Sequence, residues 1–293
     1  MGLSIMKNHV MPSTFFTGET MNTIARIALL LLAFAGQAFA GNVLFVNYNN
    51  SDNTVPAALA ADGHTVTSAN VDPSTASNYF QNANVGQYCA VVWSTAYAYN
   101  QNVTGASATL SSYATSGGHV LITTPDGIRN NGGLVSLLGG SGGTDNGNAY
   151  STVANVSNSL TTGLIDIRGQ QPPPISDMDA LCGPLGSGTV GLVTAQNTGC
   201  ASEPGYAWSL RSLGSGQVAF ITSGNFTSGN DPDWSNTAIP GDGVYNAGLR
   251  NYVYAACIPA PPVAVPTNST FGIIFGSLIL AACAAFSIRR HLG

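Results

Sequence analysis

The chain has 293 residues, of which 44% are hydrophobic and 7% are charged, against about 25% charged residues in an ordinary soluble domain. So high a hydrophobic content excludes an intrinsically disordered chain. The formal net charge is −5, from eight basic and thirteen acidic residues. This sign argues against a nucleic-acid partner, because affinity for nucleic acids comes mainly from cations placed on phosphates.

The N-terminal segment is typical of a secretory signal peptide. Arg26 precedes an apolar run at 27–35, and Ala-Phe-Ala at 38–40 offers a cleavage site for signal peptidase. The run is shorter than the roughly 20 residues that cross a bilayer; a buried N-terminal helix is the alternative. We expect residues 1–40 to be removed, which leaves Gly41 as the first residue. Met21 is a natural start, so residues 1–20 could be an over-extended gene prediction.

The C-terminal segment is predicted to anchor the protein in a membrane. Residues 258–266 contain four prolines, which fix φ and predict an extended linker. Residues 271–288 carry no charge, and at 1.5 Å per residue they form a helix about 27 Å long. Arg289 and Arg290 follow and favour the cytoplasmic side. A buried core helix is the alternative, but the linker and the arginines favour a transmembrane helix.

This C-terminal segment resembles a bacterial sorting signal. Residues 265–272 read Val-Pro-Thr-Asn-Ser-Thr-Phe-Gly, and with the apolar span and basic end they are similar to IPTL-CTERM signals, relatives of the PEP-CTERM signals handled by exosortases. The family pattern has Leu and Trp where this chain has Asn268 and Phe271. The resemblance implies signal peptidase and a sorting protease as partners, and a destination in the envelope or at the surface of a Gram-negative bacterium. The residues aligned with the signal are Val265, Pro266, Thr267, Phe271, Gly272, Arg289 and Arg290.

Residues 41–257 remain as one domain, long enough to bury about 70% of its chain surface. The domain is acidic, because it keeps every acid except Glu19 and only four basic residues. Such a surface would repel anionic polymers and attract hard cations.

The cysteines fit an exported protein. Cys283 lies in the predicted span, and an even number of cysteines remains in the domain, which suggests disulfides outside the cytosol. Four cysteines allow three pairings. We favour Cys182 with Cys200, which bracket a Gly/Thr-rich stretch, and therefore Cys89 with Cys257. No Cys-x-x-Cys or Cys/His cluster indicates structural zinc.

Strands and helices are predicted to alternate along the first part of the domain. In chain order they are a strand at 43–46, a helix at 55–61, strands at 64–68 and 89–93, a helix at 103–115, a strand at 119–123 and a helix at 133–138. The continuous apolar runs at 43–46 and 89–93 are typical of strands covered on both faces. This alternation predicts βαβ units in an α/β fold, with a mostly parallel sheet of the Rossmann or flavodoxin type.

The alternation breaks between residues 139 and 205. A Gly-rich turn region, a weakly alternating segment at 153–164, the prolines within 170–174 and a short β-branched run at 190–195 predict an inserted, partly antiparallel subregion. A strand at 216–221 and a closing helix at 247–256 then resume the pattern.

This order resembles the class I glutamine amidotransferase-like fold in its wider sense, including its ThuA-like members. The resemblance covers about 41–130 and 208–257, and rests on the segments VLFVNYNN, ADGHTV, SGGHVLITTPDG, GSGQVAFITSGNF and GLRNYVYAA. Active members of the glutaminase kind place a nucleophilic Cys on a sharp turn after a strand, with a His downstream. At that turn this chain has Thr124-Pro125-Asp126-Gly127, and the only His after His119 is His291. The resemblance therefore implies the fold without that chemistry.

Ligands of open α/β sheets bind beyond the carboxyl ends of the strands. His64, Cys89 and His119 open their strands, which places them at the opposite edge, as turn residues or a disulfide partner. The carboxyl edge is predicted to collect oxygens and aromatic rings from the loops after the strands, a set that suits a glycan. The candidate ligand-binding residues are Asn49, Asp52, Tyr97, Asp126, Asn225 and Trp234.

Calcium is the one cofactor that this oxygen-rich edge suggests, because it takes about 6–8 oxygen ligands. The candidates are Asp231, Asp233 and Asp242. They lack EF-hand spacing, and turn formation by Asp explains them equally.

Two functions stay open. The first is a non-catalytic binding or structural domain on an exported, membrane-tethered or envelope-sorted protein. The second is a divergent, glycan-directed hydrolase that uses rim carboxylates such as Asp52 and Asp126 as acid and base, with or without Ca²⁺. An Asp that follows a strand is also a common helix cap.

Overall fold

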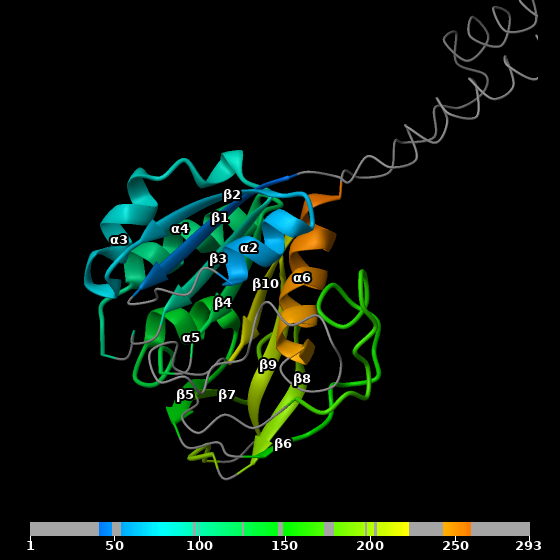
Figure 1. Ribbon diagram of the computed structural model, residues 1–293. Helices are drawn as coiled ribbons and strands as arrows, with labels where there is room; N and C mark the ends of the chain where they lie inside the picture. The colour runs from blue at the N-terminus through cyan, green and yellow to red at the C-terminus, as the bar shows by residue number, and fades with distance from the viewer. Residues whose placement is uncertain are drawn as a thin grey trace, which may run out of the picture.

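The structure is a computed structural model of the chain (Figure 1). It describes residues 41–48, 54–95, 98, 100–124, 126–145, 149–172, 179–196, 198–201, 204–222 and 243–258. The predicted signal peptide, sorting signal and transmembrane helix, and the linker after Ile258, lie outside these ranges. No helix within the described ranges is long and apolar enough to cross a membrane.

One ten-stranded mixed sheet organises the described domain. Its parallel part has the spatial order β2 (Thr65–Asn70), β1 (Asn42–Tyr48), β3 (Ala90–Thr95), β4 (His119–Thr123) and β10 (Gly216–Ile221). The carboxyl ends of these strands therefore meet at one edge, which we call the carboxyl edge. The opposite edge is the amino edge.

The second part of the sheet is antiparallel. It continues from β10 through β9 (Gly205–Leu213), β7 (Asp179–Cys182) and β5 (Gly142–Asp145), and β8 (Thr189–Gln196) with β6 (Ala149–Tyr150) branches from β9. The sequence predicts an antiparallel subregion at residues 139–205, and in the structure it extends through β9 to Leu213. The α/β class is confirmed, and the sheet is mixed because these strands join the parallel ones.

Helices cover both faces of the sheet (Figure 1). On one face lie α2 (Thr54–Ala61) and α6 (Gly243–Cys257), together with the segment around residues 150–167. The other face is covered by α3 (Pro73–Asn82), α4 (Thr104–Thr115) and α5 (Gly132–Leu138), with the 3₁₀ turn η1 (Val85–Gln87) between α3 and β3. The sequence did not predict α3 or β9.

Alternating side chains of the central strands supply both cores. In β1, Val43 and Phe45 point toward the α2/α6 face, whereas Leu44 and Val46 point toward the α3/α4/α5 face. All four are buried. This double burial explains why the strand is apolar at every position, as predicted from its sequence.

The closing helix α6 is fixed to the sheet by polar contacts. Arg250 forms an ion pair through two hydrogen bonds with Asp62, just after α2, and both side chains are largely buried. The Tyr252 hydroxyl lies 2.9 Å from the carbonyl oxygens of Val120 and Gln217. At Gly248 an added Cβ would lie 2.7 Å from the ring of Trp208, so only glycine lets the helix approach this closely.

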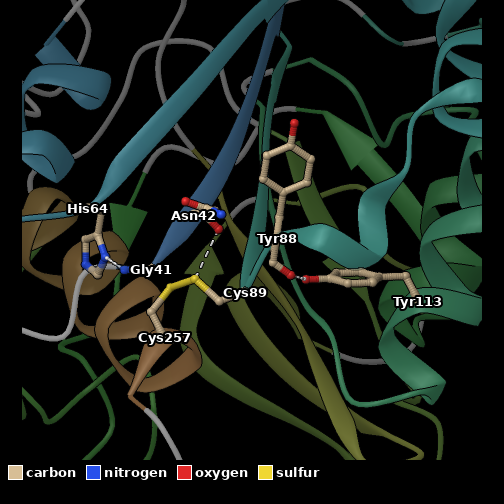
Figure 2. The surroundings of a disulfide bond; sticks show 7 residues. All are labelled: Gly41, Asn42, His64, Tyr88, Cys89, Tyr113 and Cys257. Carbon is tan, nitrogen blue, oxygen red and sulfur yellow. Dashed lines mark hydrogen bonds between the residues drawn. A yellow bond between two sulfur atoms is a disulfide. The ribbon is translucent and has the colours of Figure 1, made fainter.

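Two disulfides join the cysteines in the favoured pairing, Cys89 with Cys257 and Cys182 with Cys200. The first links the residue before β3 to the last residue of α6 (Figure 2). Disulfides of this kind persist in oxidising compartments, which indicates an extracellular or periplasmic protein.

Candidate functional site

Buried hydroxyl groups gather where the central strands end at the carboxyl edge. Ser94 of β3 pairs in register with Thr123 of β4, and Thr123 pairs in turn with Ile221 of β10. Thr95 and Thr124 are the next residues along β3 and after β4. All four hydroxyl-bearing residues are at most 1% exposed.

These hydroxyls have no partner among the described residues: the side-chain oxygens of Ser94, Thr95, Thr123 and Thr124 form no hydrogen bond there. Native proteins satisfy most buried polar groups, so each orphaned group calls for an explanation. Ser94 and Thr123 lie on one face of the sheet and Thr95 and Thr124 on the other, at the edge where open α/β sheets bind ligands, which makes this edge the candidate site.

The helix α6, which carries Asn246, covers the face of the sheet on which two of these hydroxyls lie. Ser94 and Thr123 follow the side-chain alternation of Val92 and Leu121, which places them on the face that α6 covers. Asn246 lies in the first turn of α6 and is 1% exposed, and neither its amide nitrogen nor its oxygen has a partner within the described residues. The set thus offers donors and acceptors without a formal charge.

Asp179 fixes the loop that follows β4. Its carboxylate is fully buried in β7 and accepts hydrogen bonds from the backbone N–H groups of Ile128, at 2.6 Å, and Arg129, at 3.0 Å. A carboxylate from the antiparallel part of the sheet therefore holds the loop that carries Asp126.

Asp126 is the one candidate ligand residue that the described structure contains. It is half-buried, and its backbone oxygen accepts a hydrogen bond of 3.1 Å from the N–H of Ala98. Asn131 donates to the Ala98 oxygen at 2.9 Å and accepts from the Leu134 N–H at 3.2 Å, at the start of α5. The segments after β3 and β4 are therefore joined at this edge.

The remaining predicted site residues lie outside the described ranges. They are the ligand candidates Asn49, Asp52, Tyr97, Asn225 and Trp234 and the calcium candidates Asp231, Asp233 and Asp242. No group of three or more His, Cys, Asp or Glu side chains among the described residues could hold a metal ion. The calcium hypothesis stays a prediction.

Asp72, another acid at this edge, is a helix cap. Its Oδ1 accepts hydrogen bonds from the N–H and hydroxyl of Ser74, at 2.8 and 2.6 Å, at the start of α3. These bonds, and one from the Tyr48 hydroxyl, hold the pKa of Asp72 below its usual value. The cap accounts for this carboxylate without a ligand.

Both histidines lie at the amino edge, as their positions at strand starts predict. His64 directly precedes β2 and His119 begins β4. Burial lowers the pKa of each imidazole, which favours its neutral form. Since Cys89 is bonded to Cys257 at the same edge, neither a described histidine nor this cysteine reaches the carboxyl edge.

Sequence reasoning did not find Thr95, Thr123, Thr124, Asn246 or Asp179. A hydroxyl at the end of a strand is too common to stand out. Asn246 carried a usable signal, because it is a polar residue among the buried positions Tyr245, Leu249 and Val253 of α6. No pattern in the sequence marks Asp179, whose partners are about 50 residues away.

No protein-family model matches the chain, and no curated protein does. Among solved structures, a ThuA-like protein from Parabacteroides merdae is 14% identical, with a TM-score of 0.47, over 76% of this chain and 94% of that protein. A ThuA-like protein is thus among the structural neighbours.

Two carbohydrate-active enzymes are also similar in structure. The β-galactosidase from Bacillus circulans sp. alkalophilus is 12% identical, with a TM-score of 0.38, over 72% of this chain and 30% of the enzyme. A carbohydrate deacetylase is 15% identical, with a TM-score of 0.41, over 74% of this chain and 33% of the enzyme. This chain matches about a third of each enzyme's length, and similarity at this level does not extend to activity.

Proposed function

We propose that this chain is an exported bacterial surface protein, held to the membrane by residues 271–288, whose α/β domain binds an uncharged, hydroxyl-rich ligand at the carboxyl edge without catalysis. A glycan is the ligand class that best fits this set. The observation that carries the binding proposal is the set of buried polar side chains at this edge that have no hydrogen-bond partner among the described residues: Ser94, Thr95, Thr123, Thr124 and Asn246.

The described groups favour binding over catalysis. Hydroxyls and an amide can exchange hydrogen bonds with a sugar, whereas acid–base catalysis needs a titratable group placed at the reacting atoms. The described histidines lie at the other edge, and the four cysteines of the domain are in disulfides. The hydrolase alternative rests on Asp52 and Asp126, of which only Asp126 is described.

Substitution of Thr123 by valine tests the binding site. In the free protein we expect Thr123→Val to be neutral or slightly stabilising, because a methyl group replaces a buried hydroxyl that has no partner. In the wild type, a ligand at about 100 times its Kd should add about 2.7 kcal/mol to the free energy of unfolding. Thr123→Val should lose most of this gain. Thermal unfolding of both proteins against a panel of neutral oligosaccharides measures it.

Thr67→Val on the exposed strand β2 is the matched control and should keep the full ligand response. A ligand-induced shift that is equal in all three proteins would contradict the assigned site. Release of new reducing ends from an oligosaccharide would favour the hydrolase instead.

Deletion of residues 266–293 tests the anchor separately. The truncated protein should leave the membrane fraction and appear soluble outside the cytoplasm, because it loses the uncharged span and Arg289 and Arg290. Cell fractionation followed by immunoblotting measures the distribution. Truncated protein that stays embedded in the membrane would refute the anchor, whatever the outcome at the carboxyl edge.

A further inference from the structure

A groove with uncharged polar walls lies near the amino edge, away from the hydroxyl cluster. It has a volume of about 410 Å³ and lies between the last turns of α3 and the turn η1. Apart from Ala83 its lining is made of two phenol rings and four side-chain amides, from Asn78, Tyr79, Asn82, Asn84, Gln87 and Tyr88. None of these described lining residues is charged.

The α3 wall of the groove is fixed by the core beneath it. Phe80 is fully buried and packs edge-on against Trp93, with ring centroids 5.0 Å apart. Tyr79 is the next residue on the helix and is half-buried, so part of its ring stays accessible. Asn82 donates to the Asn78 backbone and side-chain oxygens, at 2.7 and 2.9 Å, which orients both amides.

The second wall is held by α4 and the first disulfide. The Tyr113 hydroxyl donates a 2.8 Å hydrogen bond to the carbonyl oxygen of Tyr88, and the next residue, Cys89, is bonded to Cys257. Figure 2 shows the Tyr88 ring pointing away from this disulfide. Tyr113 packs so closely on Gly118 that an added Cβ there would lie 2.3 Å from the phenol ring. The Tyr88 backbone is thus fixed before a ligand binds.

The polar groups of the groove are only partly used inside the protein. Within the described structure, the side-chain amides of Asn84 and Gln87 and the Tyr79 and Tyr88 hydroxyls form no hydrogen bond to another backbone or side-chain group. Burial, and second the proximity of Tyr88, raise the pKa of Tyr79, in keeping with two phenols that share one groove. The raised pKa keeps the Tyr79 phenol neutral near pH 7.

We propose that this groove binds a neutral polysaccharide chain. A tyrosine ring offers a flat apolar face for the C–H groups of a sugar, and it does so at a low cost in conformational entropy. Amides supply a donor and an acceptor side by side, which match neighbouring sugar hydroxyls. The volume falls within the range of about 300–1,000 Å³ that is usual for small-molecule sites.

The groove does not suit the competing ligand classes. An anionic polysaccharide would meet no cation among the described lining residues, on a domain that is acidic as a whole. An extended peptide is recognised through a sheet edge or through apolar pockets for its side chains, whereas the apolar surface of this groove is limited to two rings and Ala83. Of these ligand classes, a neutral glycan chain is the one that can both stack on the tyrosine rings and form hydrogen bonds with the amides.

Affinity electrophoresis of the full-length protein in mild detergent tests the proposal. The gels contain a soluble β-glucan, a mannan, a galactan or, as the anionic probe, a polyuronate. We expect at least one neutral polysaccharide to slow the protein and the polyuronate not to. Tyr79→Ala combined with Tyr88→Ala should weaken this binding by roughly ten- to a hundred-fold, as truncation of aromatic anchors does.

Matched variants separate the groove from the rest of the protein. Tyr79→Phe with Tyr88→Phe keeps both rings and should retain most of the affinity, and Tyr254→Ala removes a half-buried tyrosine of α6 and should change nothing. Thr123→Val should not alter the retardation either, so failure at the carboxyl edge is distinguished from failure here. The proposal is overturned if no neutral polysaccharide retards the wild type, or if the double alanine variant is retarded equally.

Discussion

Replacing Cys89 and Cys257 together by alanine is expected to lower the free energy of unfolding by about 5 kcal/mol. This disulfide closes a loop of 168 residues, and the entropy that a cross-link removes from the unfolded chain grows with the logarithm of loop length. Cys182 and Cys200 are only 18 residues apart, so their replacement is expected to remove about 3 kcal/mol.

Urea unfolding of the non-reduced mature protein, followed by the fluorescence of the buried Trp93 and Trp208, measures both losses. The two double variants are controls for each other, because each removes two sulfur atoms. If removal of the Cys182–Cys200 disulfide lowered the free energy of unfolding more than removal of Cys89–Cys257, loop entropy would not determine which disulfide stabilises the protein more. Under reducing conditions, which remove both disulfides, the free energy of unfolding of the wild type should be lower than that of either non-reduced variant.

Asp179→Ala is expected to lower the free energy of unfolding by about 3 kcal/mol, because it leaves the N–H groups of Ile128 and Arg129 without their acceptor in a largely buried site. Asp179→Asn keeps one oxygen in place and should lose less. The same urea experiment measures both. We also expect Asp179→Ala to abolish ligand binding at the carboxyl edge, since the carboxylate holds the loop that carries Asp126.

Asp166→Ala is the matched control. Asp166 also accepts two side-chain hydrogen bonds, from Arg168, and these bonds lower its pKa to about 2. The pair is exposed, however, and exposed ion pairs contribute little to stability. Equal losses from Asp166→Ala and Asp179→Ala would contradict the importance assigned to burial at Asp179.

The parallel part of the fold could be predicted from the sequence because its strands are buried on both faces. That burial makes residues 43–46 and 90–93 apolar at every position, and such runs are visible without a structure. The amino-edge positions of His64 and His119 followed from the same strands. Disulfide pairing followed only in part, because three pairings were possible and spacing alone selected one.

Helix α3 and strand β9 show where sequence patterns fail. The sequence of α3, Pro-Ser-Thr-Ala-Ser-Asn-Tyr-Phe-Gln-Asn, is mostly polar, although Asp72 and Pro73 are a typical helix start. In β9, Arg211 and the serines at 209 and 212 interrupt the apolar pattern by which a strand is recognised in a sequence. Both elements are stabilised by the parts of the protein that they pack against, and a single sequence does not show this packing.

The candidate sites were still harder to predict. The carboxyl-edge cluster joins Ser94, Thr123 and Asn246 through strand order and through the return of α6, and neither follows from spacing along the chain. The amino-edge groove joins α3 to η1 over residues 78–88, a stretch of ordinary polar sequence. Phe80 and Val85 are buried, and because they face the core the polar side chains of the same stretch face outward. The sequence alone does not show which residues of the stretch are buried.

The position of Cys257 has a mechanical consequence. It is the last residue of α6, so tension applied to the polypeptide beyond this helix reaches the disulfide before it can peel the helix away turn by turn. The sulfur bridge passes that load to the start of β3, which is bonded along its length to β1 and β4. Pulling on this end therefore loads the central strands of the sheet through β3, and not α6 alone.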